Sequence, residues 1–276
     1  MERIDAIVVW HNPSQKEAEA IITYNQSVGN VYVVDNSESD NRTLLATIPN
    51  AVYMPLRQNM GIAYALNRGC EAAMNAGAEW VLTMDQDSLW NRTPIEDYLA
   101  QAIQYPHIND IALFAPYHDY GVVDKHVRPP YQEEEMVMCS GNLLRISAWQ
   151  KTGGFREDFF IDEVDDELCL HLRQLGYHII RINTAVLQHS LGEGPKDVRL
   201  IHHTYIPHPA WRQYYMGRNM KKMQQLYPEK KAYYQKMIRK RIKRLWLYDW
   251  DDKINKLTAF YRGLRDGSSA EAIVKK

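Results

Sequence analysis

Short apolar runs alternate with helical patterns through the first third of the chain, and this alternation constrains the fold more than any other feature. Strands are expected at Asp5–Trp10, Val31–Asp35, Ala51–Pro55 and Trp80–Met84. Helices are expected at Gln15–Tyr24 and from Ile62 to Gly77, where apolar or small residues recur with helical spacing. Strands that alternate with helices are typical of a mainly parallel sheet covered on both faces. We therefore predict an α/β fold.

The composition is that of a soluble globular protein. The chain has 276 residues, of which 45% are hydrophobic and 24% charged, and its formal net charge is −1. This near-neutral balance argues against a nucleic-acid binder, which would be strongly basic. No stretch of about 18 uncharged apolar residues occurs, so no membrane span is predicted. The three cysteines lie far apart without metal-ligand spacing, and we expect a reduced, cytoplasmic protein.

The composition changes after about residue 210. From there the sequence is rich in cations and aromatic residues and has a helical character. We expect two domains: an α/β domain over residues 1–210 and a C-terminal helical extension over residues 211–276.

Carboxylates follow two of the expected strands. Asp35 ends one apolar run, and Asp85 and Asp87 end another in "VLTMDQD". In α/β sheets ligands bind outside the carboxyl ends of the strands, so we expect these side chains at one edge. The Asp85 and Asp87 pair suits a hard divalent cation that shares oxygen ligands with substrate phosphates, although an acidic turn is the alternative. The same spacing at Asp249 and Asp251 is interpreted as a solvated helix end.

A second acidic segment follows an aromatic run. Five of six positions are acids: Asp162, Glu163, Asp165, Asp166 and Glu167. The leucines after them predict a helix that ends at Gly176. Acids at a helix N-terminus complement the helix dipole, which accounts for two or three of the five. Crowded carboxylates also raise one another's pKa, which is how a general base is tuned.

Further polar residues follow this acidic segment. His189 comes directly after a short apolar run, and Arg212, Arg218 and Asn219 lie in "HPAWRQYYMGRNMKKM". Taken alone, a structural or surface histidine and a helix with ordinary surface cations are the preferred explanations of these positions. Arg212 and Arg218 are six residues apart and are not expected on one face of a straight helix.

In combination, these motifs resemble the family 2 glycosyltransferases with a GT-A fold, and most closely their bacterial rhamnosyltransferase-like branch. The resemblance spans roughly residues 4 to 220. It depends on segments that occur in the family's order: "VVDNSE", "NMGIAYALNRGCEAA", "VLTMDQDS", "SGNLLR", "GGFREDFFIDEVDDELCLHLRQLGY", "QHSLGE" and "WRQYYMGRN". Several short motifs in a fixed order are far more specific than any one of them.

The resemblance implies a nucleotide and metal site. Asp35 would contact the base or the ribose, close to the loop that contains Asn59 and Gly61. Asp85 would lie beside the ribose and the metal, and Asp87 would bind Mg²⁺ or Mn²⁺ directly.

The resemblance also implies the remaining roles. His189 matches the histidine that completes metal and diphosphate binding, and Asp165 occupies the position of the catalytic base. Arg218 and Asn219 match a pair expected near the diphosphate or the acceptor. One position departs from the family: His171 stands where arginine is common. A helix rotates by about 200° over two residues, so Arg173 is not expected to replace that arginine.

The implied function is inverting, metal-dependent transfer of a sugar from a nucleotide diphosphate donor to a hydroxyl of a glycan or lipid-linked acceptor, in cell-surface polysaccharide synthesis. dTDP-L-rhamnose is the favoured donor, and a UDP-sugar stays open. A sugar nucleotidyltransferase should have a glycine-rich loop after the first strand, and an NAD-dependent oxidoreductase should have GxGxxG there. The segment "WHNPSQKEAEA" contains no glycine. A glycoside hydrolase would not need strand-end aspartates suited to a metal, and a non-catalytic sugar-binding module would not need the acidic segment.

A basic segment lies near the C-terminus. Between Glu229 and Arg244 there are eight cations and one acid. Apolar residues recur on one helical face at Ile238, Ile242, Leu245 and Trp246. Such a helix suits the surface of an anionic membrane, which would place the protein at the inner face of the plasma membrane. Packing on the α/β domain and a dimer contact are the alternatives.

Overall fold

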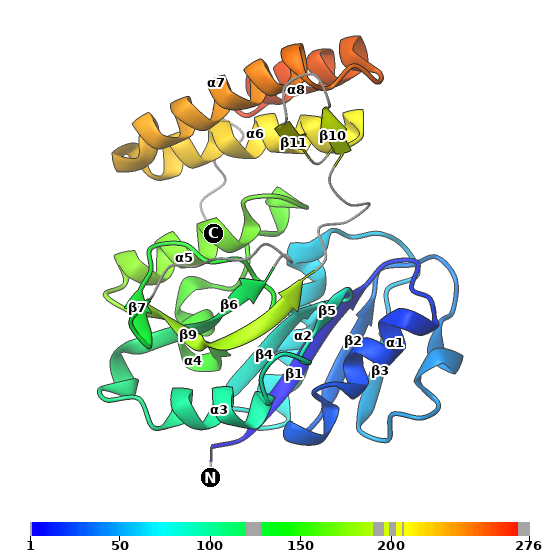
Figure 1. Cartoon of the computed structure of the whole chain (residues 1–276), viewed down its shortest axis with the longest axis vertical. Coiled ribbons are helices and arrows are strands. Elements are labelled where there is room, and N and C mark those ends of the chain that lie inside the picture. The colour runs from blue at the N-terminus through cyan, green and yellow to red at the C-terminus, as the bar shows by residue number, and fades with distance from the viewer. Residues whose placement is uncertain (1, 120–127, 190–195, 199–202, 206, 270–276) are drawn as a thin grey trace. The chain divides into compact units, whose positions relative to one another are not determined.

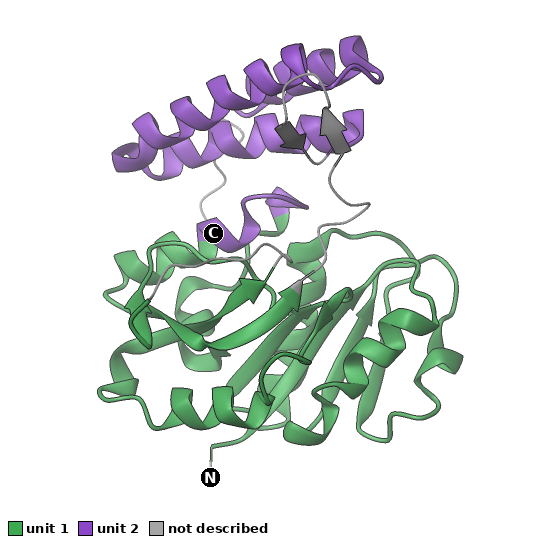
Figure 2. Ribbon diagram, in the orientation of Figure 1, with its two compact units in different colours: residues 1–157, 168–190 green, residues 158–167, 191–276 purple. Residues whose placement is uncertain are grey.

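The computed structural model describes residues 2–119, 128–189, 196–198, 203–205 and 207–269 (Figure 1). The chain divides into two compact units (Figure 2). Unit 1 comprises residues 1–157 and 168–190, and unit 2 comprises residues 158–167 and 191–276. This division differs from the expected boundary at residue 210, because the segment with the five acids belongs to the helical unit.

Unit 1 contains one large sheet. Its strands are β1 (Ile4–Trp10), β2 (Val31–Asp35), β3 (Ala51–Pro55), β4 (Trp80–Asp85), β5 (Ser88–Leu89), β6 (Ile111–Asp119), β7 (Tyr131–Glu133), β8 (Asn142–Arg145) and β9 (His178–His189). Their order is β3-β2-β1-β4-β8-β6-β9-β5, with β7 paired to β9. The first four strands are parallel, as expected. The sheet as a whole is mixed, because β8 is antiparallel to both β4 and β6, and β5 and β7 are antiparallel to β9.

Helices cover both faces of this sheet. They are α1 (Gln15–Ile22), α2 (Ile62–Asn75), α3 (Ile95–Ile103), α4 (Ile146–Thr152) and α5 (Val164–Gln174), the last of which begins in unit 2. Alternate residues of β1 point to opposite faces. Val8 packs in a core with residues of α1 and α3. Ile7 lies against α2, where a Cβ atom on Gly69 would come within 2.4 Å of the Ile7 side chain.

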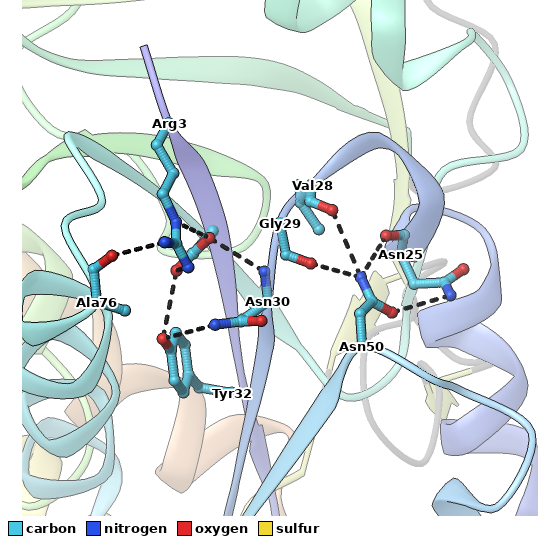
Figure 3. Close-up of polar contacts among 9 residues, drawn as sticks. Arg3, Asn25, Val28, Gly29, Asn30, Tyr32, Asn50 and Ala76 are labelled. Atoms are coloured by element: carbon cyan, nitrogen blue, oxygen red, sulfur yellow. Dashed lines mark hydrogen bonds and ion pairs between the residues drawn. The ribbon is translucent and has the colours of Figure 1, made fainter. Parts of the chain in front are cut away.

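Buried polar groups fix the amino-terminal edge of the first three strands (Figure 3). Asp5 is fully buried and forms an ion pair of 3.1 Å with Arg3. Its carboxylate also accepts hydrogen bonds from the backbone N–H of Asn30 and from the Tyr32 hydroxyl. Asn50, just before β3, donates to two backbone carbonyls of the turn before β2, each at 2.7 Å. Because these groups are satisfied within the fold, this edge is a structural one.

Besides the segment 158–167, unit 2 contains a hairpin and three long helices. The hairpin pairs β10 (Lys196–Val198) with β11 (His203–Tyr205), and the helices are α6 (Ala210–Leu226), α7 (Lys231–Leu247) and α8 (Lys253–Asp266). Glycines bring α6 and α8 close together. A Cβ atom on Gly217 would lie 2.4 Å from the Phe260 carbonyl oxygen, and one on Gly263 would lie 2.1 Å from the Tyr214 carbonyl oxygen. Only glycine permits this separation of the two backbones.

Helix α7 does not present the apolar face expected from its sequence. Leu245 is 1% exposed, whereas its neighbour Trp246 is 56% exposed. The buried side of α7 carries Tyr234, Arg241 and Leu245, so the expected apolar stripe divides between a packed and an exposed side. Arg241 donates from Nε to the Gln213 side chain of α6 at 2.9 Å, and burial lowers the pKa of Arg241 to about 10. Among the described helices, none is long and apolar enough to cross a membrane.

The expectation that Asp249 lies at a solvated helix end was wrong. Asp249 is 2% exposed and forms an ion pair of 2.6 Å with Lys256, which is also buried. It is therefore a structural anchor between the end of α7 and α8, whereas Asp251 is exposed as expected. The local spacing of acids does not reveal a cation supplied by the next helix.

Candidate active site

The carboxyl ends of β1, β2 and β4 lie at one edge of the sheet. Asp35 pairs in register with Trp10, and Asp85 pairs with Val9. Asp87 follows in the turn between β4 and β5. The parallel register thus places Asp35 and Asp85 at the same edge, as the sequence predicts.

Asp35 anchors a loop. Its side chain is fully buried. One carboxylate oxygen accepts from the Ser37 N–H at 2.9 Å, and the other accepts from the Asn41 amide and the Tyr53 hydroxyl, both at 2.8 Å. Burial and the adjacent Asp35 raise the pKa of Tyr53 to about 12, which keeps its hydroxyl protonated as a donor. Asp35 therefore shapes the loop after β2, and its direct contact with a nucleotide stays a prediction.

The predicted loop of Asn59 and Gly61 is tied to the end of β2 by Asn36. The buried Asn36 side chain accepts from the Met60 N–H at 3.1 Å and donates to the Gly61 carbonyl at 3.1 Å. Asn59 accepts from the Gly61 N–H at 3.0 Å. Gly61 has φ +88° and immediately precedes α2, so a residue with a side chain would be strained there. Asn59 and Gly61 thus lie beside Asp35, as expected.

Two residues after β1 complete this edge, and the sequence analysis did not select them. The N–H of His11 donates to the Gln86 side chain at 2.7 Å, and its ring Nδ1 lies 3.3 Å from the Asn36 carbonyl oxygen. The Asn12 N–H donates to the Ser37 hydroxyl at 2.7 Å. The loops after β1, β2 and β4 are therefore connected. The sequence signal that could have identified His11 and Asn12 is a pair of polar residues directly after an apolar run.

The turn that contains Asp87 is held by two serines. The Asp85 N–H donates to the Ser140 hydroxyl at 3.1 Å, and Ser140 donates to the Ser88 hydroxyl at 2.7 Å. Ser88 pairs across the sheet with the backbone of His189. The structure thus brings the backbone of His189 opposite the residue that follows Asp87. The side chain of His189 lies outside the described residues.

The donor chemistry of this turn fits a magnesium or manganese ion. Asp85 and Asp87 are partly buried carboxylates at a strand end. Hard divalent cations prefer oxygen ligands and commonly use one or two carboxylates together with substrate phosphates. Within the described residues, no group of three or more His, Cys, Asp or Glu side chains is arranged to hold a metal. Two carboxylates, with a phosphate to complete the coordination, are the arrangement that fits.

In unit 2, helix α6 holds the loop that leads into the five acids. Arg212 binds the Asp162 carboxylate through Nη2 at 2.9 Å and Nε at 3.1 Å. Arg218 donates to the Phe159 carbonyl at 3.1 Å and to the carbonyl before it. Asn219 is fully buried and donates to three carbonyls of the same loop at 2.8–2.9 Å. Although Arg212 and Arg218 are six residues apart, both reach this loop, because it runs along the helix.

The held loop has an unusual backbone. Phe160, Asp162 and Glu163 have positive φ angles of 63°, 66° and 62°. Residues other than glycine rarely adopt this region, and such conformations persist only where the surroundings impose them. The carbonyl hydrogen bonds from Arg218 and Asn219 supply that constraint. In this structure the pair therefore positions the acidic segment, and its contact with diphosphate or acceptor stays a prediction.

The acids after this loop have distinct environments. Helix α5 begins at Val164, so the last three acids lie in its first turn. Glu163 and Asp166 share a hydrogen bond, and Tyr234 also hydrogen-bonds Glu163. Burial, followed by the charges of Asp166 and Asp165, raises the pKa of Glu163 well above its usual range. Burial and Asp165 raise the pKa of Asp166 to about 7. Asp165 accepts a hydrogen bond from the Asp166 N–H at 3.1 Å.

Arg173 binds the edge strand β7. Its guanidinium lies 2.9 Å from the Glu133 carboxylate and donates to the Glu134 carbonyl at 3.2 Å.

Comparison with known proteins identifies similar chains. The model of the family "Glycosyl transferase family 2" matches residues 20–160. The chain is 28% identical over 238 residues to the dTDP-rhamnosyl transferase RfbF of Shigella flexneri, covering 78% of each chain. It is 25% identical over 233 residues to an N-acetylglucosaminyl-diphospho-decaprenol L-rhamnosyltransferase of Mycobacterium tuberculosis, covering 66% of this chain and 76% of the relative.

Two solved structures have a similar fold. One is GalNAc-T7 with UDP, GalNAc and Mn²⁺, with a TM-score of 0.54 and 9% identity, covering 69% of this chain and 44% of that chain. The other is S. aureus TarS 1-349, with a TM-score of 0.53 and 15% identity, covering 68% and 60%. At these identities the similarity shows the fold alone.

Proposed function

Because the chain belongs to glycosyltransferase family 2 and has a GT-A fold, we propose that it is an inverting, metal-dependent enzyme that transfers L-rhamnose from dTDP-L-rhamnose to a hydroxyl of a glycan or lipid-linked acceptor. Such a reaction would serve the synthesis of a cell-surface polysaccharide. The observation that carries the proposal is the shared carboxyl edge of β1, β2 and β4, where Asp35 and Asp85 end neighbouring parallel strands. Nucleotide ligands of α/β sheets bind at such edges.

The similarity to two rhamnosyltransferases supports the choice of donor and acceptor. One relative is named for dTDP-rhamnose and the other for a decaprenol-linked acceptor. Both matches cover more than three quarters of the relative, so they include most of its length. A UDP-linked sugar is the competing donor, and the experiment below distinguishes the two.

In the proposed reaction, Asp165 takes the proton of the acceptor hydroxyl as its oxygen attacks the anomeric carbon. The bond from that carbon to the phosphate oxygen breaks, and the nucleoside diphosphate leaves with the bonding electrons. One displacement inverts the anomeric centre and needs no enzyme nucleophile. A general base of this kind contributes about 10²–10⁴-fold to the rate. Arg218 and Asn219 support this step by holding the loop that leads to Asp165.

The leaving diphosphate needs compensation for its charge. A bound Mg²⁺ or Mn²⁺ would offset the negative charge that develops on the diphosphate. Asp85 and Asp87 would hold the ion, and His189, whose backbone lies opposite Ser88, would complete the site. We also propose a cytoplasmic location, consistent with three cysteines of which none forms a disulfide bond.

The test is release of nucleoside diphosphate by the purified chain. dTDP-L-rhamnose and UDP-sugars are each supplied with a polyprenyl diphosphate-linked N-acetylglucosamine acceptor, with Mg²⁺, with Mn²⁺ or with EDTA. We expect acceptor-dependent dTDP release that EDTA abolishes. Full turnover in EDTA would refute metal dependence, and turnover with a UDP-sugar alone would reassign the donor.

A further inference from the structure

One side of α7 is exposed and cationic. Its members, called here the outer face of α7, are all exposed: Lys236, Arg239, Lys240, Lys243, Trp246 and Leu247. At about 100° per residue, Lys243 lies directly opposite Tyr234, which is buried. The four cations thus occupy the side of the helix away from its packed side. Helix α7 has seven cations and no acid, and only Arg241 among the cations is buried.

The outer face ends in an apolar patch at the turn between α7 and α8. The exposed fractions are 56% for Trp246, 47% for Leu247, 73% for Trp250 and 80% for Ile254. Lys253 connects the two indoles, with its Nζ 3.7 Å from the Trp250 ring centroid and 5.6 Å from that of Trp246. The antiparallel α6 and α7 meet through Gln213 and Arg241, so this turn lies at the end of unit 2 where α6 begins (Figure 1).

The acids near this patch do not cancel its charge. Asp249 is neutralised by its buried ion pair with Lys256. Asp251 and Asp252 are exposed in the turn. Their negative charges are outnumbered by the positive charges of Lys253 and of the four cations of the outer face. The surface therefore combines a positive stripe with four exposed large apolar side chains.

We propose that the outer face of α7 and the α7–α8 turn bind the surface of a membrane that contains anionic phospholipids. The cations would contact the headgroups, and Trp246, Leu247 and Trp250 would enter the boundary between headgroups and acyl chains. Tryptophan is enriched at that boundary, and basic helices with apolar groups bind there.

The charge pattern favours a lipid surface over a second copy of the chain. A symmetric dimer applies the same patch to itself, which would bring the cations of one outer face against those of the other. Lysine is also depleted in the core of protein interfaces, whereas three of the four cations here are lysines.

Vesicle flotation with the full chain tests the proposal. We expect binding to vesicles that contain phosphatidylglycerol, weaker binding to phosphatidylcholine alone, and release from the anionic vesicles at high salt. Lys240→Gln with Lys243→Gln should lower the partition coefficient by about 30-fold, since each cation contributes about 1 kcal/mol near an anionic surface. Trp246→Ala with Trp250→Ala should weaken binding to the same vesicles at every salt concentration.

A matched variant controls for net charge. Lys16→Gln with Lys151→Gln removes two exposed cations of unit 1 and should leave binding unchanged. Absence of flotation with anionic vesicles at low salt would overturn the proposal. An equal loss of vesicle binding in the Lys240/Lys243 variant and in the Lys16/Lys151 variant would show a general charge effect. That result would overturn the assignment of the binding surface to α7. Light scattering completes the test, because a dimer that depends on Trp246 and Trp250 would make this surface a self-interface.

Discussion

At the scale of single residues, five neighbouring acids have different functions in the fold. Asp162 binds an arginine of α6, and Glu167 is buried and accepts from a tyrosine hydroxyl at 3.1 Å. Glu163 and Asp166 share a hydrogen bond. These four acids all have a partner, either in unit 2 helices and their connection or in the segment itself. Asp165, which accepts from the Asp166 N–H, is the position that the family resemblance assigns to catalysis. The segment is more than a helix cap.

The first prediction concerns the base. Asp165→Asn keeps the shape of the side chain but cannot accept the acceptor proton, so kcat should fall by about 10²–10⁴ while donor binding is retained. Steady-state kinetics and donor titration measure the two quantities. Asp166→Asn should stay active, because Asp166 hydrogen-bonds Glu163. An inactive Asp166→Asn together with an active Asp165→Asn would show that the register is wrong by one residue.

The second prediction concerns pH. Burial and Asp165 raise the pKa of Asp166 from 3.8 to about 7. Between these values the folded chain holds a proton that the unfolded chain has released, so stability falls as the pH rises through this window. Asp166→Asn removes this pH-dependent contribution to the stability of the folded chain. The decline in melting temperature from pH 5 to pH 8 should then be smaller than in the wild type.

Thermal unfolding at the two pH values measures this decline. We expect a difference of about 2 °C or more, the shift that 1 kcal/mol produces in domains of this size. Asp251→Asn, at an exposed acid, is the control and should keep the wild-type decline. An unchanged decline in Asp166→Asn would contradict the raised pKa.

At the scale of elements, the contact between α6 and α8 depends on glycine. In Gly263→Ala the new methyl group would lie 2.1 Å from the Tyr214 carbonyl oxygen and 2.8 Å from the Arg218 nitrogen. The helices must separate to admit it, which should cost about 1–3 kcal/mol of unfolding free energy, as other overpacked sites do. Denaturant unfolding measures the loss.

Thr258→Ala, at an exposed position of the same helix, is the control for this substitution and should change stability little. Alanine favours helices more than glycine by about 1 kcal/mol, so a Gly263→Ala chain that gains stability would show that α8 moves away from α6 without cost.

At the scale of the whole molecule, ligand binding should be linked to stability. A donor present at about 100 times its dissociation constant stabilises the folded chain by about 2.7 kcal/mol. A thermal-shift measurement with dTDP-L-rhamnose and Mg²⁺ should therefore raise the melting temperature of the wild type. In Asp87→Ala the part of the shift that depends on the metal should disappear, with the unliganded melting temperature unchanged.

The second Asp-x-Asp sequence of the chain provides the control for this measurement. Asp251→Ala removes an exposed acid with the same local spacing and should keep the full shift. An equal metal-dependent shift in Asp87→Ala and the wild type would exclude Asp87 as a metal ligand.

Much of unit 1 could be predicted from the sequence because its signals are local. The strands Val31–Asp35 and Ala51–Pro55 have the expected bounds, and α2 begins at Ile62 as expected. Apolar runs form buried strands wherever helices cover both faces of a sheet. Parallel strands end at one edge, so the location of Asp35 and Asp85 followed from their positions in the chain.

Other features depend on partners that are distant in the sequence, and only the tertiary structure decided them. The direction of β8 depends on its neighbours β4 and β6. Asp35 proved to be a buried anchor because Asn41 and Tyr53 come from other segments. Leu245 and Trp246 are adjacent apolar residues, yet the packing of α7 buries one and exposes the other. Periodicity shows which residues share a side of an element, but which side is covered depends on the elements packed against it.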